Sequence, residues 1–177
     1  MATTKILIAG FGGQGILFSG KALAYTGLKA GKEVSWLPSY GPEMRGGTAN
    51  CSVTISDTPI GSPIVDKPDI LIAMNLPSLE KYFYETEKGG YIIYDSSLIT
   101  KQENREDATV VGIPATKLAT DNGLNGLANM IIMGKAIKTT GVLSLEQIKN
   151  SLSQMVPAKK AQLLENNIKA IELGYNY

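Results

Sequence analysis

The chain contains no histidine and only one cysteine, Cys51, and these absences restrict its chemistry. Without histidine it lacks the commonest general base, the serine-type triads and the usual ligand of zinc sites. One cysteine can form neither an intramolecular disulfide nor the ligand set of an iron–sulfur cluster. We therefore expect no catalytic residue and no metal site in this chain. Cys51 lies in a strand-like segment and is predicted to be a small core residue.

Strong charge of either sign is also missing. The net charge is +1, with basic and acidic residues interspersed, so the sequence predicts neither a nucleic-acid partner nor an anionic membrane partner. The apolar segment after Met1 is too short for a signal peptide or a spanning helix, and we expect a cytoplasmic protein. The 177 residues suit one folded domain, residues 1–177, with a sizeable core.

The periodicity of apolar residues predicts an α/β fold. Strands are expected over residues 5–9, 32–37, 48–56, 69–74, 91–94 and 109–113, and helices over 14–29 and 77–88. The first three elements form a strand–helix–strand unit, which implies two parallel strands joined by a right-handed crossover. The predicted fold class is therefore α/β, with a mostly parallel, doubly wound, Rossmann-like sheet.

The C-terminal third is predicted to be a helical tail that begins at about residue 125. Helices are expected over residues 127–138 and 158–173. Between them, Ser144 and Gln147 have the spacing of a capping box, which marks a further helix start.

A glycine-rich turn, with Gly10, Gly12 and Gly15 in a G-x-G-x-x-G pattern, separates the first strand from the first helix. Such a turn lets a ligand approach the backbone and places amides at a helix N-terminus, where an anion is favoured. No acidic residue ends the second strand, so a carboxylate that would bind the ribose of NAD or FAD is missing. A phosphate-bearing ligand, a docked loop of a partner and a purely structural turn all remain possible interpretations. Gly20, within the helix, is expected to tolerate alanine if there is room.

The segment 39–47 reads Ser-Tyr-Gly-Pro-Glu-Met-Arg-Gly-Gly and is predicted to be a loop, because glycine and proline recur in it. Paired glycines beside Arg45 would let another backbone or a ligand approach its guanidinium. The alternative is a surface loop in which Glu43 and Arg45 form a solvated pair. The candidate residues for binding a ligand or partner are Gly10, Gly12, Gly13, Gln14, Gly15, Ser39, Tyr40, Gly41, Pro42, Glu43, Met44, Arg45, Gly46 and Gly47.

These two motifs strongly resemble those of the gamma subunit, or gamma domain, of the 2-oxoacid:ferredoxin (acceptor) oxidoreductases. The resemblance covers nearly the whole chain. It continues through residues 48–53, 60–63, 73–75, 113–116 and 128–134. The segment 48–52 is more similar to gamma subunits of the 2-oxoglutarate and branched-chain types than to those of the pyruvate type.

The resemblance implies a subunit that has no activity alone. Thiamine diphosphate and iron–sulfur clusters would be held by partner subunits, namely alpha, beta and possibly delta. The complex would decarboxylate a 2-oxoacid, reduce ferredoxin and transfer the acyl group to coenzyme A, and this chain would complete the assembly and border the coenzyme A path. Two alternatives stay open: a non-catalytic scaffold of the same complex, and a free-standing nucleotide-binding protein. The isolated chain is expected to fold, as a possible homodimer.

Overall fold

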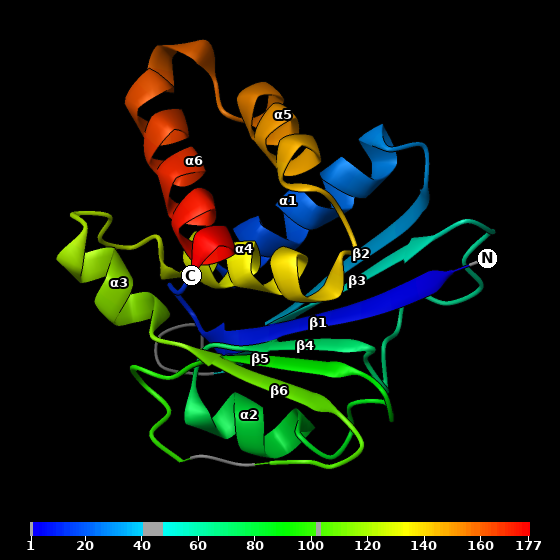
Figure 1. The fold of residues 1–177 in the computed structure, drawn as a ribbon. Helices are drawn as coiled ribbons and strands as arrows, with labels where there is room; N and C mark the ends of the chain where they lie inside the picture. The colour runs from blue at the N-terminus through cyan, green and yellow to red at the C-terminus, as the bar shows by residue number, and fades with distance from the viewer. Residues whose placement is uncertain (1, 41–47, 102–103) are drawn as a thin grey trace.

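The computed structural model describes residues 2–40, 48–101 and 104–177 as a sheet covered by helices (Figure 1). The strands are β1 (Thr3–Phe11), β2 (Glu33–Tyr40), β3 (Thr48–Ser56), β4 (Ile70–Ala73), β5 (Tyr91–Asp95) and β6 (Thr109–Ile113). The helices are α1 (Ile16–Lys29), α2 (Leu76–Tyr82), α3 (Ala115–Asp121), α4 (Ala128–Thr140), α5 (Leu145–Met155) and α6 (Ala161–Asn176), and α6 is preceded by a 3-10 turn (Ala158–Lys160). In these ranges no helix combines the length and the apolar character needed to span a membrane.

The six strands form one mixed sheet in the order β2-β3-β1-β4-β5-β6. Strands β1, β4, β5 and β6 are parallel to one another, whereas β3 is antiparallel to both of its neighbours, β1 and β2. The expectation that the first two strands are parallel is confirmed, because β1 and β2 run in the same direction, but they are not neighbours: β3 lies between them. The physical reason is the connection after β2, residues 41–47, which is shorter than the roughly twelve residues that a parallel crossover needs.

Helices cover both faces of the sheet, so the predicted α/β class with a mostly parallel sheet is confirmed (Figure 1). Helices α1, α4, α5 and α6 lie on one face, and α2 lies on the other. Side chains alternate between the faces along each strand. Ile6 and Ile8 of β1 therefore belong to the larger buried cluster, while Leu7 packs with Leu79 and Phe83 in the smaller cluster under α2.

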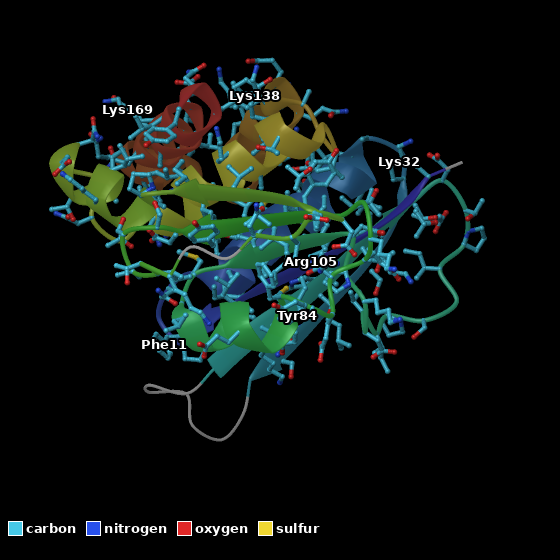
Figure 2. All side chains as sticks on the ribbon, turned by 60° about the horizontal axis from the view of Figure 1, so that its bottom comes forward. Phe11, Lys32, Tyr84, Arg105, Lys138 and Lys169 are labelled. Carbon is cyan, nitrogen blue, oxygen red and sulfur yellow. The ribbon has the colours of Figure 1, made fainter. Side chains whose placement is uncertain are left out.

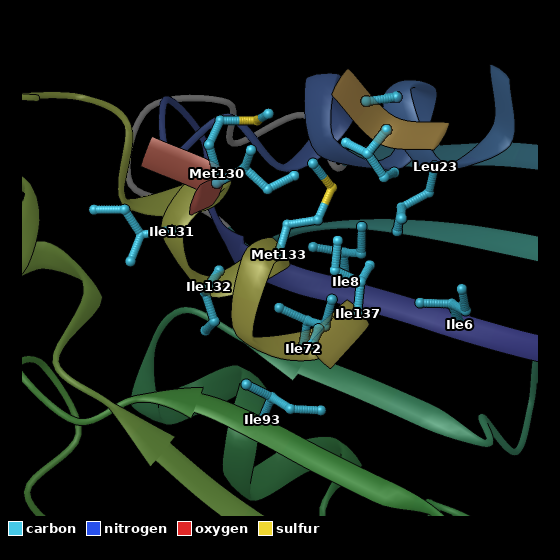
Figure 3. Packing of buried hydrophobic residues seen from close by; sticks show 14 of the residues in the cluster. Ile6, Ile8, Leu23, Ile72, Ile93, Met130, Ile131, Ile132, Met133 and Ile137 are labelled. Atoms are coloured by element: carbon cyan, nitrogen blue, oxygen red, sulfur yellow. The ribbon is translucent and has the colours of Figure 1, made fainter. Parts of the chain in front are cut away.

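The C-terminal helices are fixed to the sheet through α4. Its side chains Met133 and Ile137 lie beside Ile8 and Ile72 in the larger buried cluster (Figure 3). The predicted capping box at the start of α5 is present: Gln147 N donates to Ser144 Oγ at 3.2 Å, and Ser144 N donates to Gln147 Oε1 at 2.8 Å.

Helices α4 and α6 cross with their backbones in contact. A Cβ on Gly174 would overlap the carbonyl of Ile131, with its carbon 2.6 Å away. A Cβ on Gly134 would overlap the carbonyl oxygen of Ile171 and lie 2.8 Å from the amide nitrogen of Tyr175. Only glycine fits at these two positions, because the neighbouring atoms are backbone and cannot rotate away.

Two helices depart from the sequence-based expectation. Helix α2 begins as predicted, with Asn75 Oδ1 accepting from Ser78 N at 2.8 Å, but it ends at Tyr82 rather than at residue 88. The chain beyond this end is held by Arg105, whose Nη1 donates to the carbonyls of Phe83 at 2.6 Å and Thr86 at 3.0 Å. No local pattern shows this distant contact. The short helix α3 was not predicted at all.

The prediction that Cys51 is a core residue is confirmed. Its side chain is fully buried, and Trp36 Nε1 donates to Sγ at 2.9 Å. Burial raises the pKa of the Cys51 thiol to about 11, so the thiol is protonated near neutral pH. A protonated, buried thiol is chemically inert.

The expectation that Gly20 tolerates alanine was conditional on room for the methyl group, and the structure leaves no such room. A Cβ on Gly20 would overlap Cys51 Sγ and lie 3.1 Å from Trp36 Nε1. We predict that Gly20→Ala lowers the free energy of unfolding by about 1–3 kcal/mol, the usual penalty of overpacking. Urea denaturation followed by circular dichroism measures this. The matched control is Lys21→Ala at the exposed neighbouring position. An unchanged or raised midpoint for Gly20→Ala would show that the core yields to the added methyl group.

Candidate functional site

The candidate site lies where the carboxyl ends of β1 and β4 meet in the middle of the sheet. From β1 the chain passes through α1 on one face to β2, and from β4 it passes through α2 on the other face to β5 (Figure 1). The chain therefore leaves the two neighbouring strands in opposite directions. In open α/β sheets such a switch point is the usual place of a ligand crevice.

The glycine turn occupies this switch point, but its bounds differ from the prediction. Gly10 is still part of β1, and the turn itself comprises residues 12–15 before α1 begins at Ile16. Gly13 has φ of 91° and Gly15, the N-cap of α1, has φ of 75°, values that favour glycine. No side chain caps α1, which leaves its first amides available at the site.

The side chain of Gln14 ties the turn to the ends of both strands. Its Oε1 accepts from Phe11 N at 2.6 Å, and its Nε2 donates to the carbonyl of Met74 at 3.0 Å. A Cβ on Gly10 would lie only 2.6 Å from this Oε1. Gly10 thus makes room for the Gln14 amide, which explains its place in the motif without a direct ligand contact.

On the other side, Asn129 of α4 holds the turn, and the sequence analysis did not identify this residue. Its Nδ2 donates to the carbonyl of Gly15 at 3.2 Å and to Ser19 Oγ at 3.1 Å. The contact is so close that a Cβ on Gly15 would overlap the Asn129 amide group. The signal in the sequence is a polar residue in the otherwise apolar first half of α4.

A pocket of about 250 Å³ opens beside the turn. Its lining includes Gly13 and Gln14 of the turn, together with Met74 and Leu98. The rest is lined by Thr116, Ala119 and Thr120 of α3, by Asn125 and Gly126 in the connection before α4, and by Ala128, the first residue of α4. The lining combines apolar side chains with a few hydroxyl and amide groups, the composition typical of a small-molecule site.

A buried carboxylate, Asp95 at the end of β5, orders the α3 wall of the pocket. Its Oδ2 accepts from Thr116 N at 3.0 Å and from Thr116 Oγ1 at 2.6 Å, and its Oδ1 accepts from Ser97 N at 3.0 Å. Asp95 is fully buried, and both of its carboxylate oxygens accept hydrogen bonds from protein groups. It therefore positions the wall and is not free to act on a ligand.

The second predicted motif, residues 39–47, begins at the carboxyl end of β2, at the same end of the sheet as the glycine turn. Ser39 and Tyr40 belong to β2, so the prediction of a loop from residue 39 is wrong at these two positions. Pro38 does not interrupt β2, because an outermost strand needs no inward amide at every residue. Tyr40 pairs with Ala49, which pairs with Gly10, so the end of β2 is level with the turn across one intervening strand. The predicted residues Gly41, Pro42, Glu43, Met44, Arg45, Gly46 and Gly47 lie outside the described residues.

A larger hollow of about 620 Å³ lies at the opposite end of the strands from the glycine turn, near the amino ends of β5 and β6. Tyr84 and Arg105 border it (Figure 2), together with Lys67, Glu87, Lys88, Glu106 and Asp107. Basic and acidic side chains are equally represented, and Arg105 is engaged with Asp107 at 2.8 Å. Mixed, mutually compensated charge gives this hollow no preference for an ion of either sign.

The donor set of the chain does not fit a redox centre. The only cysteine is buried with a raised pKa, and the described residues contain no cluster of three or more cysteine, aspartate or glutamate side chains that could hold a metal ion. The fold and the site together define a Rossmann-like protein with a glycine-rich turn between its first strand and its first helix and with no cluster of metal ligands among its described residues.

Comparison with known proteins identifies the family. Residues 5–177 match the family described as "Pyruvate ferredoxin/flavodoxin oxidoreductase", and the chain belongs to this family as a gamma-type member. It is similar to the 2-oxoglutarate synthase subunit KorC of Methanocaldococcus jannaschii, with 35% identity over 97% of this chain and 91% of that protein. It is also similar to the ketoisovalerate oxidoreductase subunit VorA of Methanothermobacter marburgensis, with 37% identity over 98% of this chain. The chain spans only 36% of the length of that VorA subunit.

Solved structures agree with this assignment. The gamma subunit of a keto/oxoacid ferredoxin oxidoreductase from Geobacter sulfurreducens has a TM-score of 0.86 and 28% identity, over 99% of this chain and 96% of that one. A 2-oxoglutarate:ferredoxin oxidoreductase from Magnetococcus marinus, with 2-oxoglutarate, coenzyme A and succinyl-CoA bound, has a TM-score of 0.88 and 25% identity, over 99% of this chain and 31% of that one. The predicted resemblance to gamma subunits is confirmed.

Proposed function

We propose that this chain is the gamma subunit of a multisubunit 2-oxoacid:ferredoxin oxidoreductase, which decarboxylates a 2-oxoacid, passes electrons to ferredoxin and forms an acyl-CoA. The observation that carries the proposal is the match to the gamma subunit of a keto/oxoacid ferredoxin oxidoreductase, which covers 99% of this chain and 96% of that one. The names of the relatives favour 2-oxoglutarate or a branched-chain 2-oxoacid as the substrate.

The chemistry of the chain supports a division of labour. With no histidine and one buried, protonated thiol, this chain lacks the commonest general base and the cysteine ligands of an iron–sulfur cluster. Thiamine diphosphate and iron–sulfur clusters would be held by alpha and beta subunits, and possibly by a delta subunit. The gamma subunit would then contribute structure and a binding surface.

Affinity purification of the tagged chain from its native cell tests the assignment. We expect it to bring down partner subunits that contain iron, acid-labile sulfide and thiamine diphosphate. Activity of that preparation on a panel of 2-oxoacids then identifies the substrate. Recovery of the chain alone, under conditions in which a tagged alpha subunit brings down its own partners, would exclude the assignment and favour a free-standing nucleotide-binding protein.

We further propose that the glycine turn and the segment after β2 border the path of coenzyme A. Coenzyme A carries phosphate groups, and the turn presents uncapped helix amides beside an open pocket. The end of β2 is level with the turn, so the chain that follows Tyr40 starts from the same edge of the sheet. Arg45, in that following segment, would supply a guanidinium for a phosphate or for a carboxylate of a partner.

Arg45→Lys is expected to be harmful although it keeps the charge, because lysine lacks the planar two-pronged geometry of arginine. Losing a charge-assisted contact typically costs about 1.5–3 kcal/mol, or roughly tenfold to a hundredfold in the affected constant. Coenzyme A titration and gel filtration of the mutant complex measure the two consequences. A raised KM for coenzyme A in an intact complex supports the coenzyme A path, and loss of the complex supports a scaffold role. Wild-type behaviour in both would leave only a solvated pair of Arg45 with Glu43.

A further inference from the structure

The glycine turn is held in place by two side-chain amides, Gln14 and Asn129. Gln14 belongs to the turn itself and attaches it to the strands. Asn129 comes from a different layer of the molecule, the first turn of α4. It therefore links the turn to the helices that cover one face of the sheet.

The contact of Asn129 with the turn is specific. Its Nδ2 divides its two hydrogens between the carbonyl of Gly15 and the hydroxyl of Ser19, at 3.2 and 3.1 Å. The Gly15 carbonyl also accepts the first helical bond of α1, from Ser19 N at 3.1 Å. The amide of Asn129 thus fixes both the N-cap and the first turn of α1, the two parts that orient the free amides of this helix.

Burying the Asn129 amide costs free energy, because its Oδ1 has no hydrogen-bond partner, and this cost indicates a functional reason for the residue. Asn129 is 4% exposed, and its Oδ1 is buried without a hydrogen-bond partner. A buried acceptor that stays unpaired loses its hydration without compensation, which an apolar residue at this position of α4 would avoid. Because the compensating contacts of Asn129 go to the turn, its contribution is to the geometry of the turn.

The support behind Asn129 is rigid. Gly134, further along α4, is in backbone contact with α6, and the side chains of α4 pack on the sheet. A side chain anchored on such a helix can hold a loop to within a small displacement. The close fit between the turn and Asn129 is also visible at Gly15, because only glycine at this position leaves space for the Asn129 amide.

We propose that Asn129 is a positioning residue for coenzyme A: it orients the glycine turn so that the amides of the turn and of the start of α1 meet a phosphate group. This inference rests on the proposed function of the turn. It assigns a role to a residue that does not line the pocket and acts through Gly15 and Ser19.

The test compares variants in the assembled complex. Asn129→Ala removes both donated bonds, and Ser19→Ala, at a buried hydroxyl, removes only one of the two acceptors. Asn167→Ala is the control, because Asn167 is equally buried and also donates from Nδ2 to a backbone carbonyl, that of Leu163 at 2.8 Å, but lies on α6. The measurements are the KM for coenzyme A, kcat, the melting temperature and hydrogen exchange of the amides of residues 12–17.

We expect Asn129→Ala to raise the KM for coenzyme A about tenfold with little change in kcat, as loss of uniform binding does, and to speed exchange of the turn amides. Ser19→Ala is expected to produce a smaller effect of the same kind. Asn167→Ala is expected to lower the melting temperature to a similar extent with an unchanged KM. If Asn129→Ala does not assemble, Ser19→Ala alone carries the test.

Two results would overturn the inference. Equal KM values and equal exchange rates for the Asn129→Ala, Asn167→Ala and wild-type complexes would reduce Asn129 to an ordinary buried amide. A Gly13→Val complex identifies which statement has failed. If Gly13→Val raises the KM for coenzyme A while Asn129→Ala and Ser19→Ala do not, the role of the turn stands and the role of Asn129 falls. If none of the three raises it, the proposed coenzyme A contact falls as well.

Discussion

Gly174→Ala is expected to destabilise the chain by about 3 kcal/mol, the upper end of the usual overpacking penalty. The new methyl group would overlap the carbonyl of Ile131 on α4, and this obstacle is backbone. Relief requires α6 to move away from α4, which would open the larger buried cluster around Ala170 and Ile171. The result would be an α6 that is detached from α4, or a chain that unfolds at a much lower denaturant concentration.

Urea denaturation monitored by circular dichroism measures this effect. Gly61→Ala is the control, because a Cβ there meets nothing within 4 Å, and we expect it to stay within about 0.5 kcal/mol of wild type. Equal midpoints for the two variants would mean that the α4–α6 crossing adjusts freely and does not fix the tail.

Gly13→Val is expected to cause a large loss of function in the assembled complex. The backbone of Gly13 has φ of 91°, which strains a β-branched residue, and its Cβ would project into open space beside the pocket. We expect the KM for coenzyme A in the assembled complex to rise tenfold or more, which corresponds to about 1.4 kcal/mol or more of lost binding.

Gly31→Val separates the effect of backbone strain from the effect of a side chain placed beside the pocket. Gly31 has φ of 75°, also meets nothing within 4 Å, and follows α1 at the far end from the turn. The Gly31→Val variant should lose stability as Gly13→Val does, but the KM of its complex for coenzyme A should equal that of wild type. If the two variants have the same KM, the turn serves only to pack a helix on a strand. Gly20→Ala, which the sequence suggested as a harmless comparison, cannot serve, because it overpacks Cys51.

The parts of the fold that were predictable from the sequence are those with a local cause. The apolar run at β4, the capping box at Ser144 and the alternation along β3 each reflect neighbours in the chain, and all three were placed correctly. The position of β3 between β1 and β2 was missed, because strand order depends on how short the connection after β2 is and on which edge is free. The end of α2 was missed for a similar reason, since Arg105 holds it from a distant loop.

The candidate site was predictable as a motif but not as a structure. The spacing of Gly10, Gly12 and Gly15 identified a turn between a strand and a helix, and the turn is there, although Gly10 itself belongs to β1. The two amides that hold it were less visible: Gln14 was named only as part of the motif, and Asn129 lies far along the chain. The pocket depends on α3, whose first turn is held by the buried Asp95, and a single buried carboxylate gives no periodic signal.

The central claim is that this chain acts only as a subunit of a 2-oxoacid:ferredoxin oxidoreductase. The most direct test is 2-oxoacid-dependent and coenzyme A-dependent reduction of a low-potential viologen dye, measured with the purified chain alone and with the complex purified through the same tag. We predict no reduction by the chain alone, even with thiamine diphosphate added, and reduction by the complex that requires coenzyme A. Dye reduction by the isolated chain, or an active complex that keeps its full activity after this chain is removed, would contradict the claim.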